Sequence, residues 1–304
     1  MGISSKPLLI SIVGPTAVGK TALAIDLAQW LNTEIISADS RQFYQEMTIG
    51  TAKPTVEELE RVPHHFINTH SIETLYSAGE FGRDAIQKIE ELHRTNKSLI
   101  AVGGSGLYLK AIWEGFDEMP EIATEVREKL NKELLQGGLS PLLEELEKRD
   151  LAYFQEVDQH NGQRVIRALE VIRGTGKPFS FYRKNKKNEL PYANLKIGLN
   201  MDREKLFDRI NLRMDQMIEQ GLFDEAQGLH TYRAHNALQT VGYSEIFEFM
   251  DGVYDKDEAI RLLKRNSRRY AKRQLTWFGR YDDIHWFESD KIEEIKDLIS
   301  KTLL

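Results

Sequence analysis

The sequence predicts an α/β fold in which a parallel sheet is flanked by helices and interrupted by a helical insertion. Short apolar runs at 8–13, 34–39 and 98–102 have the composition of buried parallel strands. Stretches with helical apolar spacing lie between them, and strands that alternate with helices indicate a parallel sheet. After residue 119 the chain changes to charged helical patterns, with no clear strand before 195–200.

The helices of the core follow from apolar spacing and from their end signals. We predict helices at 21–31, 77–94, 202–221 and 255–278. Ser77 and Glu80 have the spacing of a capping box, and Gly221 suits the end of a helix. The apolar seam of the second helix consists of Phe81, Ile86, Ile89 and Leu92.

The domain organisation follows from the change in pattern. We expect a helical insertion domain at 120–190, which interrupts a core domain formed by 1–119 and 191–304. A basic loop with aromatic residues, KPFSFYRKNKK at 177–187, would close the insertion.

Composition favours a protein of the cytoplasm. The chain of 304 residues is 41% hydrophobic, which suffices for a packed core, and it has neither a membrane-spanning apolar run nor a signal-peptide pattern. The absence of cysteine excludes disulfides, thiolate nucleophiles and cysteine-based metal sites. We therefore expect no membrane partner, and we expect a monomer.

Basic residues are clustered, although the net charge is -6. Residues 261–280 contain eight Lys or Arg and no acid, and residues 163–187 contain eight more against one Glu. A run of one sign favours binding to a nucleic-acid backbone, with a solvated or salt-bridged helix face as the alternative. In the last helix we expect a buried seam of Ile260, Leu263, Tyr270 and Trp277. Outside it lie Arg261, Lys264, Arg265, Arg268, Lys272 and Arg273.

The segment GPTAVGKT at 14–21 has the spacing of a phosphate-binding loop, which gives the sheet a P-loop NTPase-like character. In such a loop, backbone N–H groups face a diphosphate, the lysine neutralises it, and the threonine binds Mg²⁺. We predict Mg²⁺ as cofactor, with Thr21 as its ligand. The loop serves nucleotides such as ATP in other proteins and does not by itself name the ligand. The predicted diphosphate- or nucleotide-binding residues are Gly14, Pro15, Thr16, Ala17, Val18, Gly19, Lys20 and Thr21.

Two other strand ends carry candidate residues. Asp39 follows the second strand, at the edge where α/β sheets bind ligands, and is a candidate general base, turn cap or acid near the metal. Small residues in GGSG (103–106) permit close approach of a ligand, although a plain turn explains them equally. We predict no metal site from His64, His65, His230 and His235, which lack acidic or cysteine partners at suitable spacing.

Six segments in a fixed order carry a resemblance to a known family. They are GPTAVGKTALA (14–24), SADSRQFYQEMTIGTAKP (37–54), VGGSGLYLKAI (102–112), RVIRALEV (164–171), TVGYSEI (240–246) and YAKRQLTWF (270–278). In these segments the chain is similar to the bacterial tRNA dimethylallyltransferases. The resemblance implies transfer of a dimethylallyl group from dimethylallyl diphosphate to N6 of adenosine 37, beside the tRNA anticodon, without a need for ATP hydrolysis.

The resemblance also implies roles for individual residues. Asp39 would be the general base that takes a proton from the adenine amine, while Lys20, Thr21 and Mg²⁺ stabilise the departing diphosphate. Ser105 of GGSG would contribute to catalysis. Contacts with the tRNA anticodon arm are implied for Asp39, Ser40, Arg41, Gln42, Ser105, Arg127, Gln163, Arg164, Val165, Ile166 and Arg167.

The chain also departs from the family pattern, and two other functions stay open. Ser105, Asn161, Ser267 and Arg269 stand where the family commonly has Thr, Asp, Thr and Gln. A P-loop kinase would share the loop and the sheet but makes no use of two basic tracts. A nucleotide-switched RNA-binding protein would need a guanine-reading N-K-x-D segment, which the sequence lacks.

Overall fold

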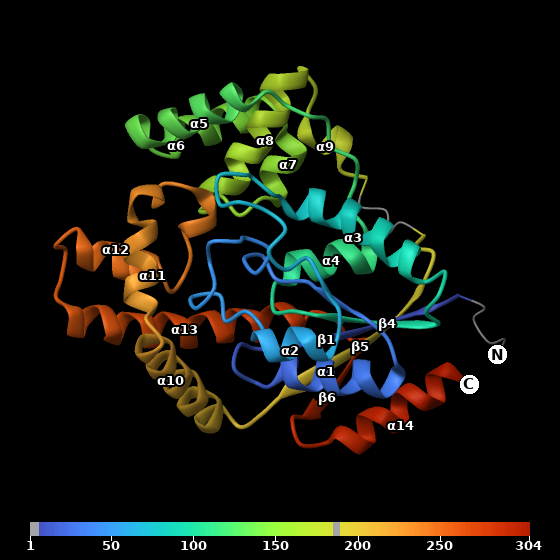
Figure 1. The fold of residues 1–304 in the computed structure, drawn as a ribbon. Coiled ribbons are helices and arrows are strands. Elements are labelled where there is room, and N and C mark those ends of the chain that lie inside the picture. Colours follow the sequence, from blue (N-terminus) through green and yellow to red (C-terminus); the bar gives the residue numbers. More distant parts are fainter. Residues whose placement is uncertain (1–5, 185–188) are drawn as a thin grey trace. The chain divides into compact units, whose positions relative to one another are not determined.

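The computed structural model describes residues 6–184 and 189–304, and the chain divides into two compact units (Figure 1). The first unit joins Met1–Gly115 to Glu189–Leu304, and the second is Phe116–Asn188. The second unit begins a few residues before the expected start at 120, because the segment that leads into its first helix belongs to it.

The first unit is built on a six-stranded sheet in the order β3-β2-β4-β1-β5-β6, and every neighbouring pair is parallel. The strands are β1 (Leu8–Val13), β2 (Ile35–Ser37), β3 (His64–His65), β4 (Ser98–Val102), β5 (Ala193–Asn200) and β6 (Ile284–Glu288). The strands predicted at 8–13 and 98–102 are confirmed. The strand predicted at 34–39 is shorter, because the chain turns after Ser37.

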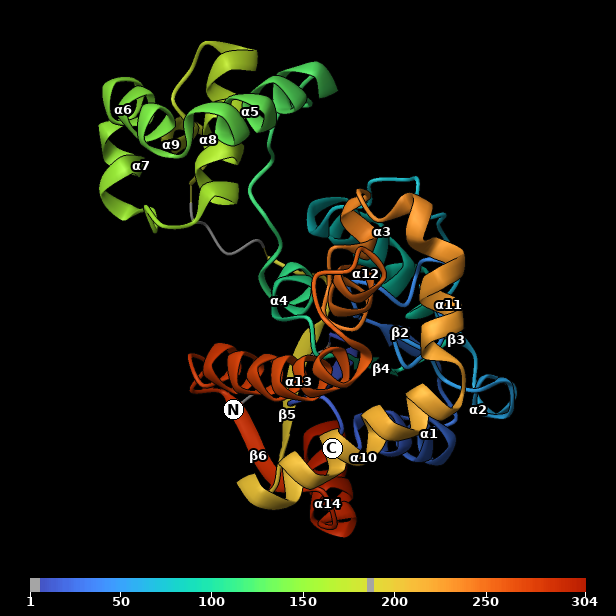
Figure 2. The same cartoon turned by 90° about the vertical axis from the view of Figure 1, so that its left-hand side faces the viewer.

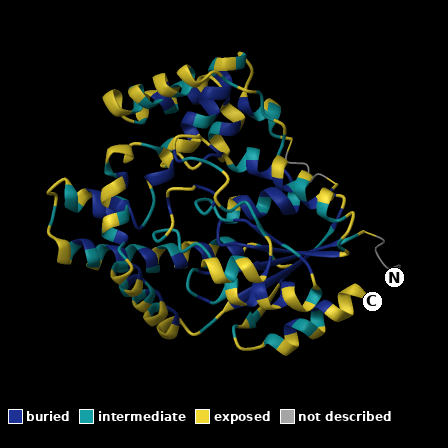
Figure 3. Cartoon of the chain, viewed as in Figure 1, coloured by how far each residue is buried: buried dark blue, intermediate teal, exposed yellow. Residues whose placement is uncertain are grey.

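Both faces of this sheet are covered, as the continuous apolar runs of its strands require. Side chains of β1 alternate between two clusters: Leu9 and Val13 pack in one, and Ile10 and Ile12 pack in the other. Strands β1, β2 and β4 are buried along their whole length, and Figure 3 shows the central strands in dark blue. The sheet is therefore a fixed platform from which the loops at its carboxyl edge project.

Nine α-helices surround the sheet in the described part of the first unit. They are α1 (Lys20–Leu31), α2 (Val56–Arg61), α3 (Ala78–Leu92), α4 (Gly106–Glu114), α10 (Arg203–Glu219), α11 (Leu222–Leu229), α12 (Ser244–Met250), α13 (Lys256–Phe278) and α14 (Ile292–Leu303). Short 3₁₀ turns lie at His230–Tyr232 and Asn236–Leu238. Helices α3 and α4 contribute to one apolar cluster and α1 and α14 to the other, so they cover opposite faces (Figure 1).

Helix ends agree with the signals in the sequence. The predicted capping box of Ser77 and Glu80 is present at the start of α3, and Asp255 caps α13. Helix α10 ends just before Gly221, whose φ of 101° is favourable only for glycine. The sequence analysis did not predict β3, β6, α2, α4, α11, α12 and α14, several of which are short.

The predicted seam of α13 is largely wrong. Of its four residues only Leu263 is buried, and the buried stripe of the helix is Ala259, Leu263, Ser267, Ala271, Gln274 and Phe278. The prediction selected large apolar residues, whereas small and polar side chains fill the face that packs on the rest of the unit. Helix α13 lies beside α10 (Figure 2).

The second unit is helical throughout its described residues, 116–184. Its helices are α5 (Thr124–Gly137), α6 (Ser140–Arg149), α7 (Leu151–Glu156), α8 (Gly162–Thr175) and α9 (Phe179–Tyr182). They share an apolar core that includes Leu130, Leu146 and Leu169. Of the predicted basic loop 177–187, residues 185–187 lie outside the described residues.

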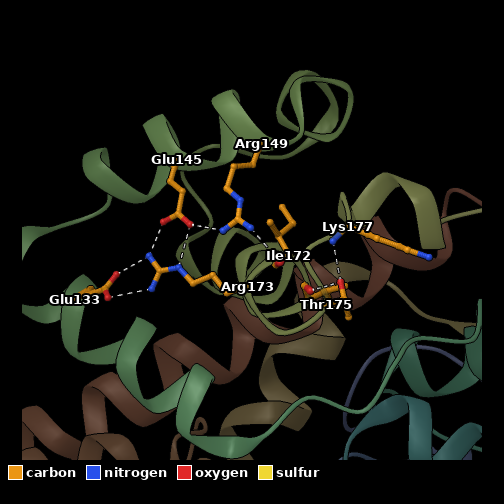
Figure 4. Close-up of polar contacts among 8 residues, drawn as sticks. Glu133, Glu145, Arg149, Ile172, Arg173, Thr175 and Lys177 are labelled. Carbon is orange, nitrogen blue, oxygen red and sulfur yellow. Dashed lines mark hydrogen bonds and ion pairs between the residues drawn. The ribbon is translucent and has the colours of Figure 1, made fainter.

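Arg173 ties three helices of the second unit together. Its guanidinium on α8 pairs with Glu133 on α5, at 2.8 Å and 3.0 Å, and with both oxygens of Glu145 on α6 (Figure 4). Arg149 also donates to Glu145, over 3.1 Å. These hydrogen bonds lower the pKa of both glutamates. The network holds α5, α6 and α8 together, and α8 carries part of the basic tract at residues 163–187.

Candidate active site

A cavity of about 180 Å³ in the first unit lies at the carboxyl edge of the sheet. The loops after β1, β2 and β4 supply residues such as Lys20, Asp39 and Gly104, and helices α10 and α13 supply Arg213 and Tyr270. Open α/β sheets bind their ligands at this edge. The cavity therefore collects the predicted phosphate loop, the predicted base and the GGSG segment in one place.

The loop after β1 has the backbone geometry of a phosphate cradle. Gly14 has a φ of 141°, and a Cβ there would lie 2.4 Å from the carbonyl oxygen of Leu199, so no other residue fits. Gly19 begins α1 at a φ of 108°, and no side chain caps the helix. The uncapped N–H groups of the first turn are available to an anion. Of the predicted loop residues, Thr16, Ala17, Lys20 and Thr21 line the cavity, whereas Val18 is buried in the core.

Lys20 is folded back on its own loop, where its Nζ donates to the carbonyl oxygen of Pro15 over 2.7 Å. Burial lowers the pKa of Lys20 to about 7, with a further lowering by Arg213, while Asp39 acts in the opposite direction. The lysine is therefore close to its titration midpoint at neutral pH, and a bound diphosphate would favour its charged form.

Arg213 on α10 is a second cation at this cavity, which the sequence analysis did not select. Burial lowers its pKa, and Asp39 opposes that shift. Among the residues that the structure describes, Arg213 has no ion pair within 4.0 Å. No local signal distinguishes it from other arginines in the 202–221 helix, because its role depends on how α10 packs.

Asp39 has one of the roles that the sequence left open, that of a turn cap, and it also lines the cavity. Its Oδ1 accepts hydrogen bonds from the backbone N–H groups of Arg41, at 2.9 Å, and Gln42, at 3.3 Å, so this oxygen caps a turn. In the described part of the chain, its Oδ2 makes no hydrogen bond. One oxygen thus fixes the carboxylate while the other, at the cavity, can accept a proton.

Ser105 joins the loop after β4 to the turn that follows β2. Its Oγ accepts a hydrogen bond from the backbone N–H of Ser40, at 3.0 Å, and donates to the Ser40 Oγ, at 3.1 Å. Gln42 is held further along, where its Nε2 donates to the carbonyl oxygens of Thr51 and Ala52, at 3.3 Å and 3.1 Å. The hydroxyl of Ser105 thus helps to position the turn that contains Asp39, the candidate base. A threonine at position 105 would keep this hydroxyl.

Gln274 is a buried polar residue of the site that was not singled out from the sequence. Its side chain is 5% exposed, accepts a hydrogen bond from Thr16 N–H (2.8 Å) and donates to the Gly104 carbonyl oxygen (3.0 Å). A Cβ on Gly104 would lie 2.2 Å from this amide. The signal in the sequence that could have identified Gln274 was the segment YAKRQLTWF, which contains this residue and carries part of the family resemblance.

The rest of the cavity lining is partly apolar. Ile210, Met214 and Met217 line it from one face of α10, and Val241 lines it from the loop before α12. Tyr270 contributes a hydroxyl whose pKa is raised to about 12, by burial first and by Asp39 second. The site can therefore hold a molecule with a charged end and a hydrocarbon end.

In the second unit, the candidate RNA-contacting residues are arranged around Glu170, which is 6% exposed. Arg127 and Arg167 pair with it at 3.0 Å and 3.1 Å, and Arg127 also donates to Gln163. Arg164 is exposed. The prediction for two neighbours needs correction, because Val165 and Ile166 pack in the core of this unit and present no side chain to a partner.

Three residues that depart from the family pattern, at positions 161, 267 and 269, lie at a helix cap, in the cavity wall and on an exposed helix face. Asn161 caps α8, accepting from Arg164 N–H over 3.3 Å, as an aspartate would. Ser267 lines the cavity, and Arg269 is exposed on α13.

The histidines lie in local contacts. His65 pairs with Glu34 and His230 with Asp251, while His64 contacts the Val62 carbonyl oxygen. The described residues contain no group of three potential histidine, cysteine or carboxylate ligands. Within the described ranges, no helix has both the length and the apolar character to cross a membrane.

Comparison with known proteins places these features in one family. The model of the IPP transferase family matches residues 42–281. The chain is 51% identical to a tRNA dimethylallyltransferase of Cytophaga hutchinsonii, over 97% of each chain, and 50% identical to one of Christiangramia forsetii, over 93% of this chain and 94% of that one.

Solved structures agree with this result. The tRNA isopentenylpyrophosphate transferase of Bacillus halodurans superimposes with a TM-score of 0.73 at 41% identity, over 98% of this chain and 97% of that one. A eukaryotic dimethylallyltransferase described as acting on tRNA gives a TM-score of 0.77 at 28% identity, over 97% and 80%. These neighbours have the P-loop NTPase-like fold, which confirms the predicted fold class. The chain therefore belongs to the IPP transferase family, and the protein is a transferase enzyme.

Proposed function

We propose that this protein transfers a dimethylallyl group from dimethylallyl diphosphate to N6 of adenosine 37 in tRNA, releasing diphosphate. The observation that carries the proposal is the meeting of Lys20, Arg213 and Asp39 around one cavity. Two cations suit a leaving diphosphate, and a carboxylate suits a nucleophile that must lose a proton. The names of the relatives support tRNA as acceptor and dimethylallyl as the transferred group, and the diphosphate of the donor is part of the proposal.

The donor binds with its diphosphate at the loop after β1. The N–H groups at the start of α1, Lys20 and Arg213 stabilise the negative charge that grows as the allylic C–O bond breaks. Ile210, Met214 and Met217 offer an apolar wall to the five-carbon chain. Near neutral pH the diphosphate draws Lys20 into its charged form.

The acceptor amine approaches the turn that follows β2. An exocyclic adenine amine is a poor nucleophile, because its lone pair is delocalised into the ring. As N6 forms its bond to the allylic carbon, Oδ2 of Asp39 takes the N6 proton, and the C–O electron pair leaves with the diphosphate. Ser40, Arg41 and Gln42 belong to the same turn and are proposed to hold the nucleobase. A base buried in the anticodon stack must be extruded to reach them.

The residues present fit a role for Mg²⁺. Thr21 lines the cavity beside Lys20, and in phosphate-binding loops of this spacing the hydroxyl after the lysine is a ligand of Mg²⁺. Thr21 would hold the ion, which when bound neutralises charge on the diphosphate. This agrees with the absence of a larger cluster of acidic ligands among the described residues.

The second unit is proposed to bind the tRNA backbone. Arg127 and Arg167 are anchored on Glu170, Arg127 also donates to Gln163, and Arg164 is exposed on the same helix as Arg167. Such contacts release counterions, so binding should weaken as salt is raised.

The direct test incubates the purified protein with unmodified tRNA, Mg²⁺ and radiolabelled dimethylallyl diphosphate in the absence of ATP. Label in tRNA that nuclease digestion and mass spectrometry place on N6 of adenosine 37 is the expected result. ATP-dependent phosphoryl transfer to a small molecule, with no label in tRNA, would support a P-loop kinase. Tight GTP binding without any transfer would support a nucleotide-switched RNA-binding protein.

A further inference from the structure

Glu225, in the first turn of α11, is held by four hydrogen bonds to a segment distant in sequence. Its Oε2 accepts the backbone N–H groups of Thr48, at 3.0 Å, and Ile49, at 2.8 Å. Its Oε1 accepts the N–H of Gly50, at 2.9 Å, and the hydroxyl of Tyr243, at 2.6 Å. A carboxylate has about four acceptor positions, so this one is fully used.

The segment held by Glu225 forms part of the cavity wall. Gly50, Thr51 and Ala52 all line the cavity. Gly50 is pressed against Tyr243, since a Cβ on it would lie 2.5 Å from the tyrosine ring. The carboxylate and the tyrosine therefore leave loop 48–52 little freedom to move.

Loop 48–52 in turn orients Gln42. The Gln42 Nε2 donates hydrogen bonds to two carbonyl oxygens of this loop, those of Thr51 and Ala52. Its Oε1 accepts a hydrogen bond from the Ser37 Oγ over 3.1 Å. Gln42 shares its turn with Asp39, whose Oδ1 accepts the Gln42 backbone N–H. Glu225 is thus linked to the turn that carries the candidate base through its hydrogen bonds to residues 48–50, the backbone of loop 48–52, and the hydrogen bonds from Gln42 to residues 51 and 52.

We propose that Glu225 is a positioning residue for the tRNA acceptor, acting through loop 48–52 on Gln42. The inference rests on the proposed function, which assigns the turn at 39–42 to the nucleobase. The donor side is held separately, by Lys20 on α1 and Arg213 on α10. Loss of Glu225 therefore weakens the binding of the tRNA acceptor and leaves the binding of dimethylallyl diphosphate unchanged.

The test compares steady-state kinetics of the full chain with Glu225→Gln and with Asp224→Asn. The amide at 225 keeps one acceptor oxygen but turns an NH₂ group toward backbone donors. The KM for tRNA should rise about tenfold, while the KM for dimethylallyl diphosphate stays within about twofold. Asp224 is exposed in the same first turn of α11, so Asp224→Asn removes the same charge and should leave both values unchanged.

A double-mutant cycle tests whether the effect passes through Gln42. With Gln42 already replaced by alanine, Glu225→Gln should change the KM for tRNA by clearly less than it does alone. Independent effects that simply multiply would contradict the path through Gln42.

One further outcome overturns the proposal, which is an equal change in both KM values in a variant that circular dichroism shows to be folded. If Glu225→Gln does not fold, Tyr243→Phe removes one of the four hydrogen bonds and should raise the KM for tRNA in the same direction by a smaller factor. Wild-type protein that transfers no prenyl group to tRNA contradicts the proposed function instead, before any variant is compared.

Discussion

Gln274 accepts a hydrogen bond from the backbone N–H of Thr16 over 2.8 Å, although the two residues are 258 positions apart. The same amide donates to the Gly104 carbonyl oxygen, so one side chain of α13 sets the distance between the phosphate loop and the loop after β4. The helix that carries the basic tract therefore also shapes the catalytic cavity.

Replacing Gln274 by alanine should weaken donor binding. Both partners lose a buried hydrogen bond, so we expect the KM for dimethylallyl diphosphate to rise about tenfold and the free energy of unfolding to fall by about 1–3 kcal/mol. Kinetics and urea unfolding measure the two effects. Thr276→Ala is the control, because this residue of α13 is exposed and its hydroxyl donates to the carbonyl oxygen of Lys272 in its own helix. Unchanged donor kinetics in Gln274→Ala would refute the link.

Asparagine at position 39 separates the two roles of Asp39. Its amide oxygen still accepts the N–H groups of Arg41 and Gln42, so the turn is kept, but the side chain cannot take a proton. We expect turnover to fall by about 10²–10⁴-fold and tRNA affinity, measured by filter binding, to stay within severalfold. Near-normal turnover would assign the base elsewhere.

The pKa of Lys20 predicts how donor use depends on pH. With a pKa of about 7 in the free site, Lys20 is charged below neutral pH and becomes neutral as pH rises, so the attraction for the diphosphate declines. The kcat/KM for the donor should fall as pH is raised from about 6 to about 8. In Lys20→Gln, kcat/KM should be low and this decline should disappear; a decline of the same size in the variant would point to another group.

The free basic residues of α13 should control the salt dependence of tRNA binding. Lys264 pairs with Asp215 and Arg268 donates to Asn211, so part of the predicted basic surface is occupied by α10. Lys272 and Arg273 are exposed, and in the described part of the chain neither forms an ion pair. Replacing both by alanine should weaken the binding of all tRNAs alike. It should also reduce the magnitude of the slope of the logarithm of the tRNA association constant against the logarithm of the salt concentration, by about 1–2. Lys264→Ala should change the slope less. Equal slopes in the wild type, the double variant and Lys264→Ala would show that this face of α13 is an ordinary solvated surface that does not bind tRNA.

Local patterns in the sequence determined much of this protein. The strand LLISIV and the capping box at Ser77 each have a signature within a few residues of sequence, and each is found as predicted. The buried stripe of α13 was misjudged because burial depends on what packs against a helix as well as on which residues are apolar.

Only the tertiary structure decided which distant residues share the cavity. Arg213, Gln274 and Glu225 have no local signature, since an arginine, a glutamine or a glutamate in a helix is most often a surface residue. The parallel sheet brings the ends of β1, β2 and β4 to one edge, and the packing of α10 and α13 brings Arg213 and Gln274 to the cavity there, while α11 brings Glu225 to loop 48–52. The sequence alone thus pointed to the loop at 14–21 and to Asp39 as candidates, while long-range packing brought the second cation, Arg213, to the same cavity and placed the residues that hold the loops.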